Sequence, residues 1–186
     1  MRDREAGFTL IEMIVAMAVI AILAAIALPS FFSESRKTKA FSEVQPMFND
    51  LRVRLEQYLQ EYGVYPTAIS PEGEMHPASA PGPTKRPILP LPASGSWDLL
   101  KLRISGNDQV YCSYTWMTYN PPLTVPPAVP PTPPVGPQAT VFGFVPPPTS
   151  FYYLIAKCDM DGDGATFSFY FSSSADPTIK KLNEGS

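Results

Sequence analysis

The feature that most constrains this chain is an apolar run close to its N-terminus. Residues 8–28 read FTLIEMIVAMAVIAILAAIAL and hold one charged side chain, Glu12. As a helix, this run is about 31 Å long, which matches the hydrocarbon thickness of a bilayer. We therefore expect one membrane-spanning helix.

The residues before the apolar run suggest that the chain is processed in an unusual place. They read MRDREAG and end in the small residue Gly7. An ordinary secretory signal has its small-residue cleavage site at the far end of the apolar run. Here the small residue comes first, so cleavage after Gly7 would remove the polar leader and keep the anchor.

The hexapeptide Gly7-Phe8-Thr9-Leu10-Ile11-Glu12 resembles the prepilin motif of type IV pilins and type II secretion pseudopilins. The resemblance extends over roughly residues 1–62 and includes Pro29, which follows the apolar run. It implies that a membrane-bound prepilin peptidase cuts between Gly7 and Phe8 and methylates Phe8. It also implies an inner-membrane subunit that an assembly platform passes into a helical filament of pilin subunits, at the cell surface or in the periplasm.

Glu12 needs a partner, because an ionised carboxylate within a membrane costs on the order of 2.5–3.5 kcal/mol at a helix centre. Cleavage would provide the α-amino group of Phe8, four residues away, in the same chain or in a neighbouring one. The resemblance implies the neighbouring subunit, where Glu12 would set the register of assembly. The alternative is a carboxylate that reaches the membrane interface by itself.

The next segment has the pattern of an amphipathic helix. Its apolar residues are spaced by three and four positions and would form one stripe: Phe41, Val44, Phe48, Leu51, Leu55, Tyr58 and Tyr62. Pro46 lies off the stripe and is expected to kink or locally melt the helix. Gly63 and Pro66 are expected to end it.

Beyond the helix, prolines cluster in two stretches, 66–92 and 121–148, which we interpret as surface loops without helix or central strand. Four segments between and after them favour strands: 97–104, 109–119, 151–158 and 166–172. The last alternates at Phe167, Phe169 and Phe171, and residues 105–108 are a plausible hairpin turn. We expect a small antiparallel sheet with one apolar face against the helix.

The predicted fold is therefore α+β and pilin-like, a long N-terminal helix packed on a small antiparallel sheet. The expected divisions of the chain are a leader at 1–7, a transmembrane and assembly helix at 8–29, an amphipathic helix at 30–63, a Pro-rich loop at 64–96 and a sheet head at 97–186 with a Pro-rich insertion at 121–150.

Two sets of residues in the head are candidates for a disulfide and for a metal site. Cys112 and Cys158 lie beyond the anchor, and in an exported domain an oxidised pair is the default, with two buried thiols as the alternative. Asp159, Asp161 and Asp163 have the spacing that begins a calcium loop, but Tyr170 stands where that loop needs a Glu. A plain hairpin turn selects the same Asp and Gly residues. Some pseudopilins hold calcium in a C-terminal loop, so the resemblance keeps a calcium loop open as an alternative for this turn.

Other classes of function find less support in the sequence. The net charge of -3 gives no basic footprint for nucleic acid. One His, His76, and two Cys exclude a structural zinc site of the usual ligand sets within one chain.

A membrane-tethered enzyme would need a catalytic constellation that these residues do not offer. A simple anchored binding module would leave Gly7, Glu12 and Pro29 as coincidences. We expect a pilus subunit, with a type II secretion pseudopilin as the alternative.

Overall fold

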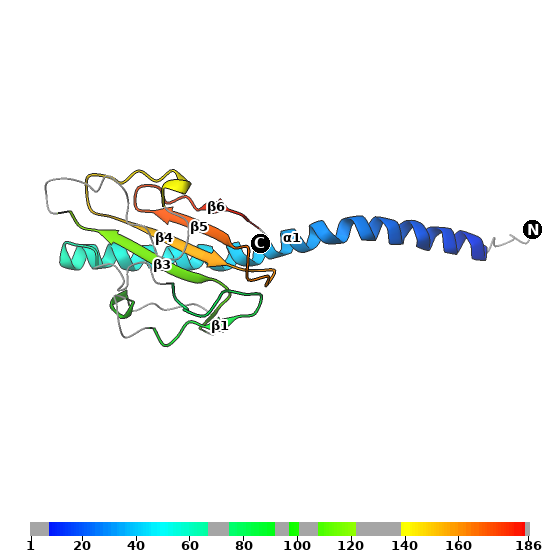
Figure 1. Ribbon diagram of the computed structural model, residues 1–186, viewed down its shortest axis with the longest axis horizontal. Coiled ribbons are helices and arrows are strands. Elements are labelled where there is room, and N and C mark those ends of the chain that lie inside the picture. Colours follow the sequence, from blue (N-terminus) through cyan, green and yellow to red (C-terminus); the bar gives the residue numbers. More distant parts are fainter. Residues whose placement is uncertain (1–7, 67–74, 92–96, 101–107, 122–138, 185–186) are drawn as a thin grey trace, which may run out of the picture. The chain divides into compact units, whose positions relative to one another are not determined.

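The computed structural model describes residues 8–66, 75–91, 97–100, 108–121 and 139–184, apart from the side chain of Pro29. It confirms the predicted α+β class, because one long helix is followed by antiparallel sheets (Figure 1). The chain divides into two compact units, residues 1–35 and 36–186. We describe each unit by itself and call the second one the head.

Helix α1 runs from Leu10 to Tyr62. It ends as predicted, because Gly63 adopts a positive φ of 76° and donates its N–H to the Leu59 carbonyl at 2.8 Å. Glycine reaches this left-handed conformation without the steric penalty of a Cβ atom. The local melting expected at Pro46 is wrong, since the helix is unbroken there. Pro46 is exposed, so its missing N–H leaves a carbonyl that water can satisfy.

The head contains a four-stranded antiparallel sheet in the order β3-β4-β5-β6, and the ribbon shows it lying along the C-terminal part of α1 (Figure 1). The strands are β3 (Ser113–Tyr119), β4 (Phe151–Cys158), β5 (Ser168–Ser173) and β6 (Lys180–Leu182). β4 has the predicted bounds. The short strand β6 was missed, because three residues are too few for an alternation to be recognised.

The inner core, between α1 and the sheet, is built from the middle of the predicted helix stripe, whereas Tyr58 and Tyr62 at the end of the stripe lie outside it. Val44, Phe48, Leu51 and Leu55 are completely buried. Their cluster includes one face of the sheet, with Tyr114, Trp116, Leu154, Ala156 and Tyr170. The helix is thus held to the head by apolar burial, at about 25 cal/mol for each Å² removed from water.

The expectation of a sheet with one apolar face is wrong. A second cluster, which we call the outer core, covers the opposite face with Met117, Phe151, Tyr153, Ile155 and Phe171. Residues of the short 3₁₀ helix η2 (Ala139–Phe142) and Phe144 pack against these side chains and belong to the outer core. The Phe142 and Phe171 rings stack there, with centroids 4.9 Å apart. The end of the Pro-rich insertion therefore contributes to the core.

The other three predicted strands differ from the structure, the last of them only in its bounds, since β5 runs from Ser168 to Ser173 and not over 166–172. Trp97 lies in a turn before the 3₁₀ helix η1 (Asp98–Leu100), so a strand there is wrong, while 101–107 fall outside the described residues. The segment 109–119 is split into β2 (Gln109–Val110) and β3. β2 pairs with β1 (Arg86–Pro87), a two-residue strand within the first Pro-rich stretch. Of the expected turn at 105–108, only Asp108 is described, with a positive φ of 49°.

Candidate functional site

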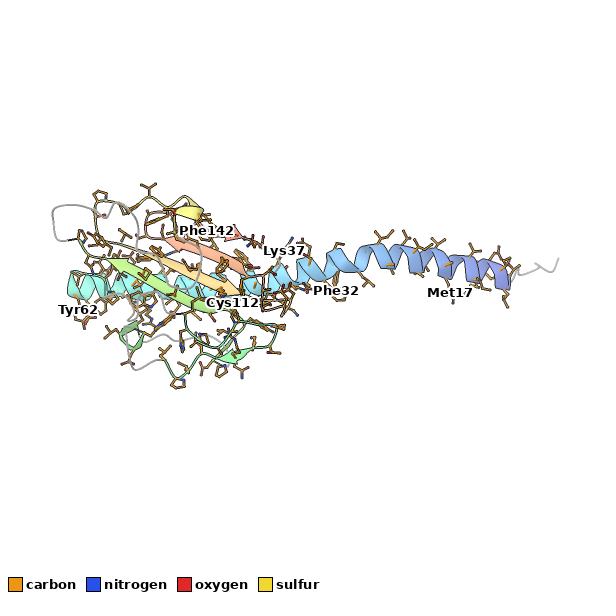
Figure 2. The ribbon with its side chains drawn as sticks, in the orientation of Figure 1. Met17, Phe32, Lys37, Tyr62, Cys112 and Phe142 are labelled. Carbon is orange, nitrogen blue, oxygen red and sulfur yellow. A yellow bond between two sulfur atoms is a disulfide. The ribbon has the colours of Figure 1, made fainter. Side chains whose placement is uncertain are left out.

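The first part of α1 presents apolar side chains to every side. From Leu10 to Leu28 the described side chains are exposed, including Ile11, Met17 and Ile20. Figure 2 shows them as sticks projecting from the helix around Met17. By length and composition, this helix is able to cross a membrane. Exposed apolar surface on this scale requires lipid or other protein chains around it.

Glu12 is held by Thr9 at the start of this helix. Its Oε2 accepts the Thr9 N–H at 2.8 Å and the Thr9 hydroxyl at 2.7 Å, while the Glu12 N–H donates to Thr9 Oγ1 at 3.3 Å. This is a capping box, which satisfies N–H groups that have no partner within the helix. The sequence signal was present, since Thr followed three residues later by Glu before an apolar run is its signature.

The structure describes only part of the predicted processing site. Gly7 lies outside the described residues, and Phe8 is 83% exposed. Residues 1–7 precede Phe8 in the sequence, so the Phe8 nitrogen is a peptide N–H, whereas cleavage after Gly7 would make it an amine. The pairing of Glu12 with that amine, and its role in register, stay predictions.

The two cysteines lie at one end of the β3–β4 ladder. Ser113 pairs with Lys157, so Cys112 and Cys158 come next and face each other across the strands. A disulfide joins them, with Cα atoms 4.4 Å apart, and both residues are completely buried. Cys112 is labelled in Figure 2, below the sheet. Among the described residues, no cysteine is free.

The Asp-rich turn between β4 and β5 has an ordered internal structure. Asp159 accepts the N–H groups of Gly162 at 2.7 Å and Gly164 at 3.1 Å. Asp163 accepts those of Ala165 and Thr166, both at 2.8 Å, and these bonds lower the pKa of its carboxyl. The N–H groups thus supply positive partial charge to a turn that carries three carboxylates.

The three carboxylates of this turn are close enough to share a metal ion, because one oxygen from each of Asp159, Asp161 and Asp163 lies within 4.8 Å of the others, although exposed acidic groups are often this close without an ion. Hard carboxylate oxygens of this kind suit calcium. Tyr170, at the position of the missing Glu, is completely buried in the inner core and offers no carboxylate. Arg36 lies 3.7 Å from Asp161 and already supplies one positive charge. A plain turn therefore remains as consistent with the geometry as a calcium loop.

His76 has a structural environment. Its Nε2 lies 2.6 Å from the Ile88 carbonyl, and its ring centroid is 5.5 Å from that of Trp97. Its backbone pairs with Tyr114 at the edge of β3, with N–H···O distances of 2.7 and 2.8 Å. The ring and the backbone thus fix the loop that carries His76 to the sheet.

Sequence reasoning missed Glu43, a polar side chain of α1 that bonds to three residues around the start of β3. Its carboxylate accepts the N–H groups of Tyr111 and Cys112 and the hydroxyl of Tyr114. Burial, together with the Glu43 charge, raises the pKa of the Tyr114 phenol well above its ordinary value, so that hydroxyl remains a donor. No local pattern marks Glu43, because its partners lie far along the chain.

Comparison with known proteins adds one match, and it lies at the N-terminus. A family model described as the prokaryotic N-terminal methylation motif matches residues 2–28. No curated protein and no solved structure matches the chain. The matched residues comprise most of the polar leader, the expected cleavage position, Glu12 and the exposed apolar part of α1. The chain thus carries, on a pilin-like α+β fold, the N-terminal signature of the type IV pilins and pseudopilins.

Proposed function

We propose that this protein is a structural subunit of a type IV pilus or a pilus-like filament. The observation that carries the proposal is the apolar, exposed start of α1, which lies within the methylation motif. Such a helix needs lipid before assembly and other helices afterwards. The motif implies a structural role.

The proposed sequence of events begins in the inner membrane. Prepilin peptidase cuts between Gly7 and Phe8 and methylates the new N-terminus, while the apolar helix keeps the chain anchored. An inner-membrane assembly platform then moves the subunit into a filament, at the cell surface or in the periplasm. There the helix exchanges lipid for the helices of other pilin subunits.

Glu12 is proposed to fix the register of that exchange. Apolar helices slide past one another at little cost, because lipid and neighbouring helices are similarly apolar. A carboxylate that meets the Phe8 amine of a neighbouring subunit removes this freedom, since any other register leaves a charge without a partner. The contact runs head to tail, so repetition builds an open helical array.

Mass spectrometry of the mature protein tests the proposal. The expected N-terminal residue is Phe8, carrying a methyl group, and the leader is expected to be absent. A Gly7→Leu variant is the matched control and should retain the leader in the same cells. Wild-type protein with an intact leader in assembled filaments would contradict the assignment.

A type II secretion pseudopilin is the second candidate. The Asp-rich turn favours it, because the resemblance described above extends to pseudopilins that hold calcium in a C-terminal loop. Deletion of this chain should then abolish export of a secreted enzyme and leave surface filaments intact. Loss of surface filaments with normal secretion would support the pilus subunit instead.

A further inference from the structure

The break between β2 and β3 falls at Tyr111 and Cys112, where the sequence favours one continuous strand. A carboxylate from α1 explains the break. Glu43 accepts the Tyr111 N–H at 2.8 and 3.0 Å from its two oxygens, and the Cys112 N–H at 3.0 Å. Both N–H groups therefore bond to the helix and not to a neighbouring strand.

Arg86 holds the same stretch of backbone from the first Pro-rich stretch. Its Nη2 donates to the Tyr111 carbonyl at 2.9 Å and to Ser113 Oγ at 3.2 Å. The peptide groups of Tyr111 thus meet a negative charge at the N–H and a positive charge at the carbonyl. Hydrogen bonds to charged groups are stronger than those between neutral groups, so this backbone is held firmly on both sides of Cys112.

These contacts act on Cys112 in addition to the β3–β4 register, which places it beside Cys158. Cys112 precedes β3 and lies opposite Cys158, the last residue of β4. Its N–H takes no part in the sheet, because that N–H donates to Glu43. The Tyr114 hydroxyl, two residues further on, also donates to Glu43, at 2.8 Å. A single side chain of α1 therefore orders the backbone that presents the Cys112 sulfur to its partner.

We propose that Glu43 is a positioning residue for the disulfide, so that Cys112 and Cys158 are brought together as α1 docks on the sheet. In the covalent step, one thiolate attacks a small disulfide oxidant and releases one thiol. The second cysteine then attacks the mixed disulfide and releases another. The protein loses two electrons and two protons, and the oxidant is reduced to two thiols. The proposal concerns the head alone and does not rest on the filament role.

Redox equilibrium of the full-length protein in detergent tests this role. The protein is equilibrated in buffers of reduced and oxidised glutathione, and its free thiols are quantified by labelling. Glu43→Ala is expected to lower the equilibrium constant for disulfide formation by about tenfold, because two partly buried N–H groups and a hydroxyl lose their acceptor.

Arg52→Ala is the matched control. Arg52 also connects α1 to the sheet, but its bonds of 2.9 Å lead to Ser172 Oγ and the Pro177 carbonyl and not to the segment around Cys112. Because these bonds lie elsewhere in the head, Arg52→Ala is expected to change the equilibrium constant for disulfide formation by less than about twofold. Equal decreases in both variants, or no decrease in Glu43→Ala, would overturn the proposal.

Amide hydrogen exchange supplies a second measurement if Glu43→Ala fails to fold. Glu43→Gln keeps the volume of the side chain and one acceptor oxygen, but its NH₂ group cannot accept. With the Gln oxygen at the place of Oε1, which accepts from Cys112 and Tyr114, the NH₂ group replaces Oε2, and Tyr111 loses its 2.8 Å acceptor. The Tyr111 amide is therefore expected to exchange faster in this variant, whereas the amides of the β4–β5 ladder keep their protection. Unchanged protection at Tyr111 would also refute the positioning role.

Discussion

Removing the Cys112–Cys158 disulfide is expected to cost the head a large part of its stability. The bond closes a sequence separation of 46 residues. A chain-entropy estimate for a loop of that length is about 4 kcal/mol, through restriction of the unfolded chain. Since a typical domain is stable by only about 5–15 kcal/mol, this loss moves the midpoint of unfolding substantially.

The double substitution Cys112→Ala/Cys158→Ala is the appropriate perturbation. Both cysteines are completely buried, so serine would add a buried hydroxyl without a partner, at about 1–3 kcal/mol each. Alanine leaves the loss of loop closure as the main effect. Reduced wild-type protein provides a second comparison, in which both sulfur atoms remain.

Urea unfolding, followed by the fluorescence of the buried Trp97 and Trp116, measures the free energy of unfolding. We expect a lower midpoint and also a steeper dependence on urea, because the unfolded chain without the cross-link is more expanded. A loss below about 1 kcal/mol with an unchanged dependence on urea would refute the argument from loop closure.

Three further results are expected. Glu12→Leu should insert in the membrane and persist there but enter filaments poorly, because assembly loses its register. Membrane and sheared-filament fractions measure this, with Met13→Leu as the control and no wild-type subunit present; normal amounts of Glu12→Leu in filaments would contradict it. If the Asp-rich turn binds calcium, a chelator should lower the melting temperature of the head, and Asp161→Ala should abolish that effect; an unchanged melting curve would leave a plain turn. Burial raises the pKa of Tyr152 and of Tyr170 from the ordinary 10.0 to about 12. The unfolded chain therefore loses these protons first, and stability, which is full below pH 10, should fall toward pH 12 in urea titrations; a flat profile, or one that Tyr170→Phe leaves unaltered, would count against this.

The helix and β4 could be predicted from the sequence because their signals are local. The stripe from Val44 to Leu55 repeats every three or four residues, and each member is buried where α1 meets the sheet. The methylation motif at the N-terminus is likewise a contiguous pattern, and the family model matches it at residues 2–28. Features that depend only on residues close together in the sequence can be predicted without a structure.

Features that depend on distant partners were not accessible in the same way. The strand breaks at Tyr111 because Glu43, 68 residues away, takes its N–H. The outer core was missed because an alternating pattern was assumed for each strand. In β4 the apolar run from Phe151 to Ala156 leaves no residue for solvent, which is the pattern of a strand buried on both faces. The apolar run could have been recognised in the sequence, but the covering of this face by η2 could not.

The pairing of Tyr119 with Phe151 also makes the head suitable for carrying foreign sequence. These residues are partners in the β3–β4 ladder, their rings stack with centroids 5.4 Å apart, and the Pro-rich insertion departs from one and returns to the other. Each doubling of such a loop costs only about 0.6 kcal/mol in closure entropy. An epitope or enzyme tag inserted between Asn120 and Ala139 is therefore expected to leave the pairing of Tyr119 with Phe151 intact. If the chain builds a filament, that position would repeat on every subunit and give a dense, regularly spaced array.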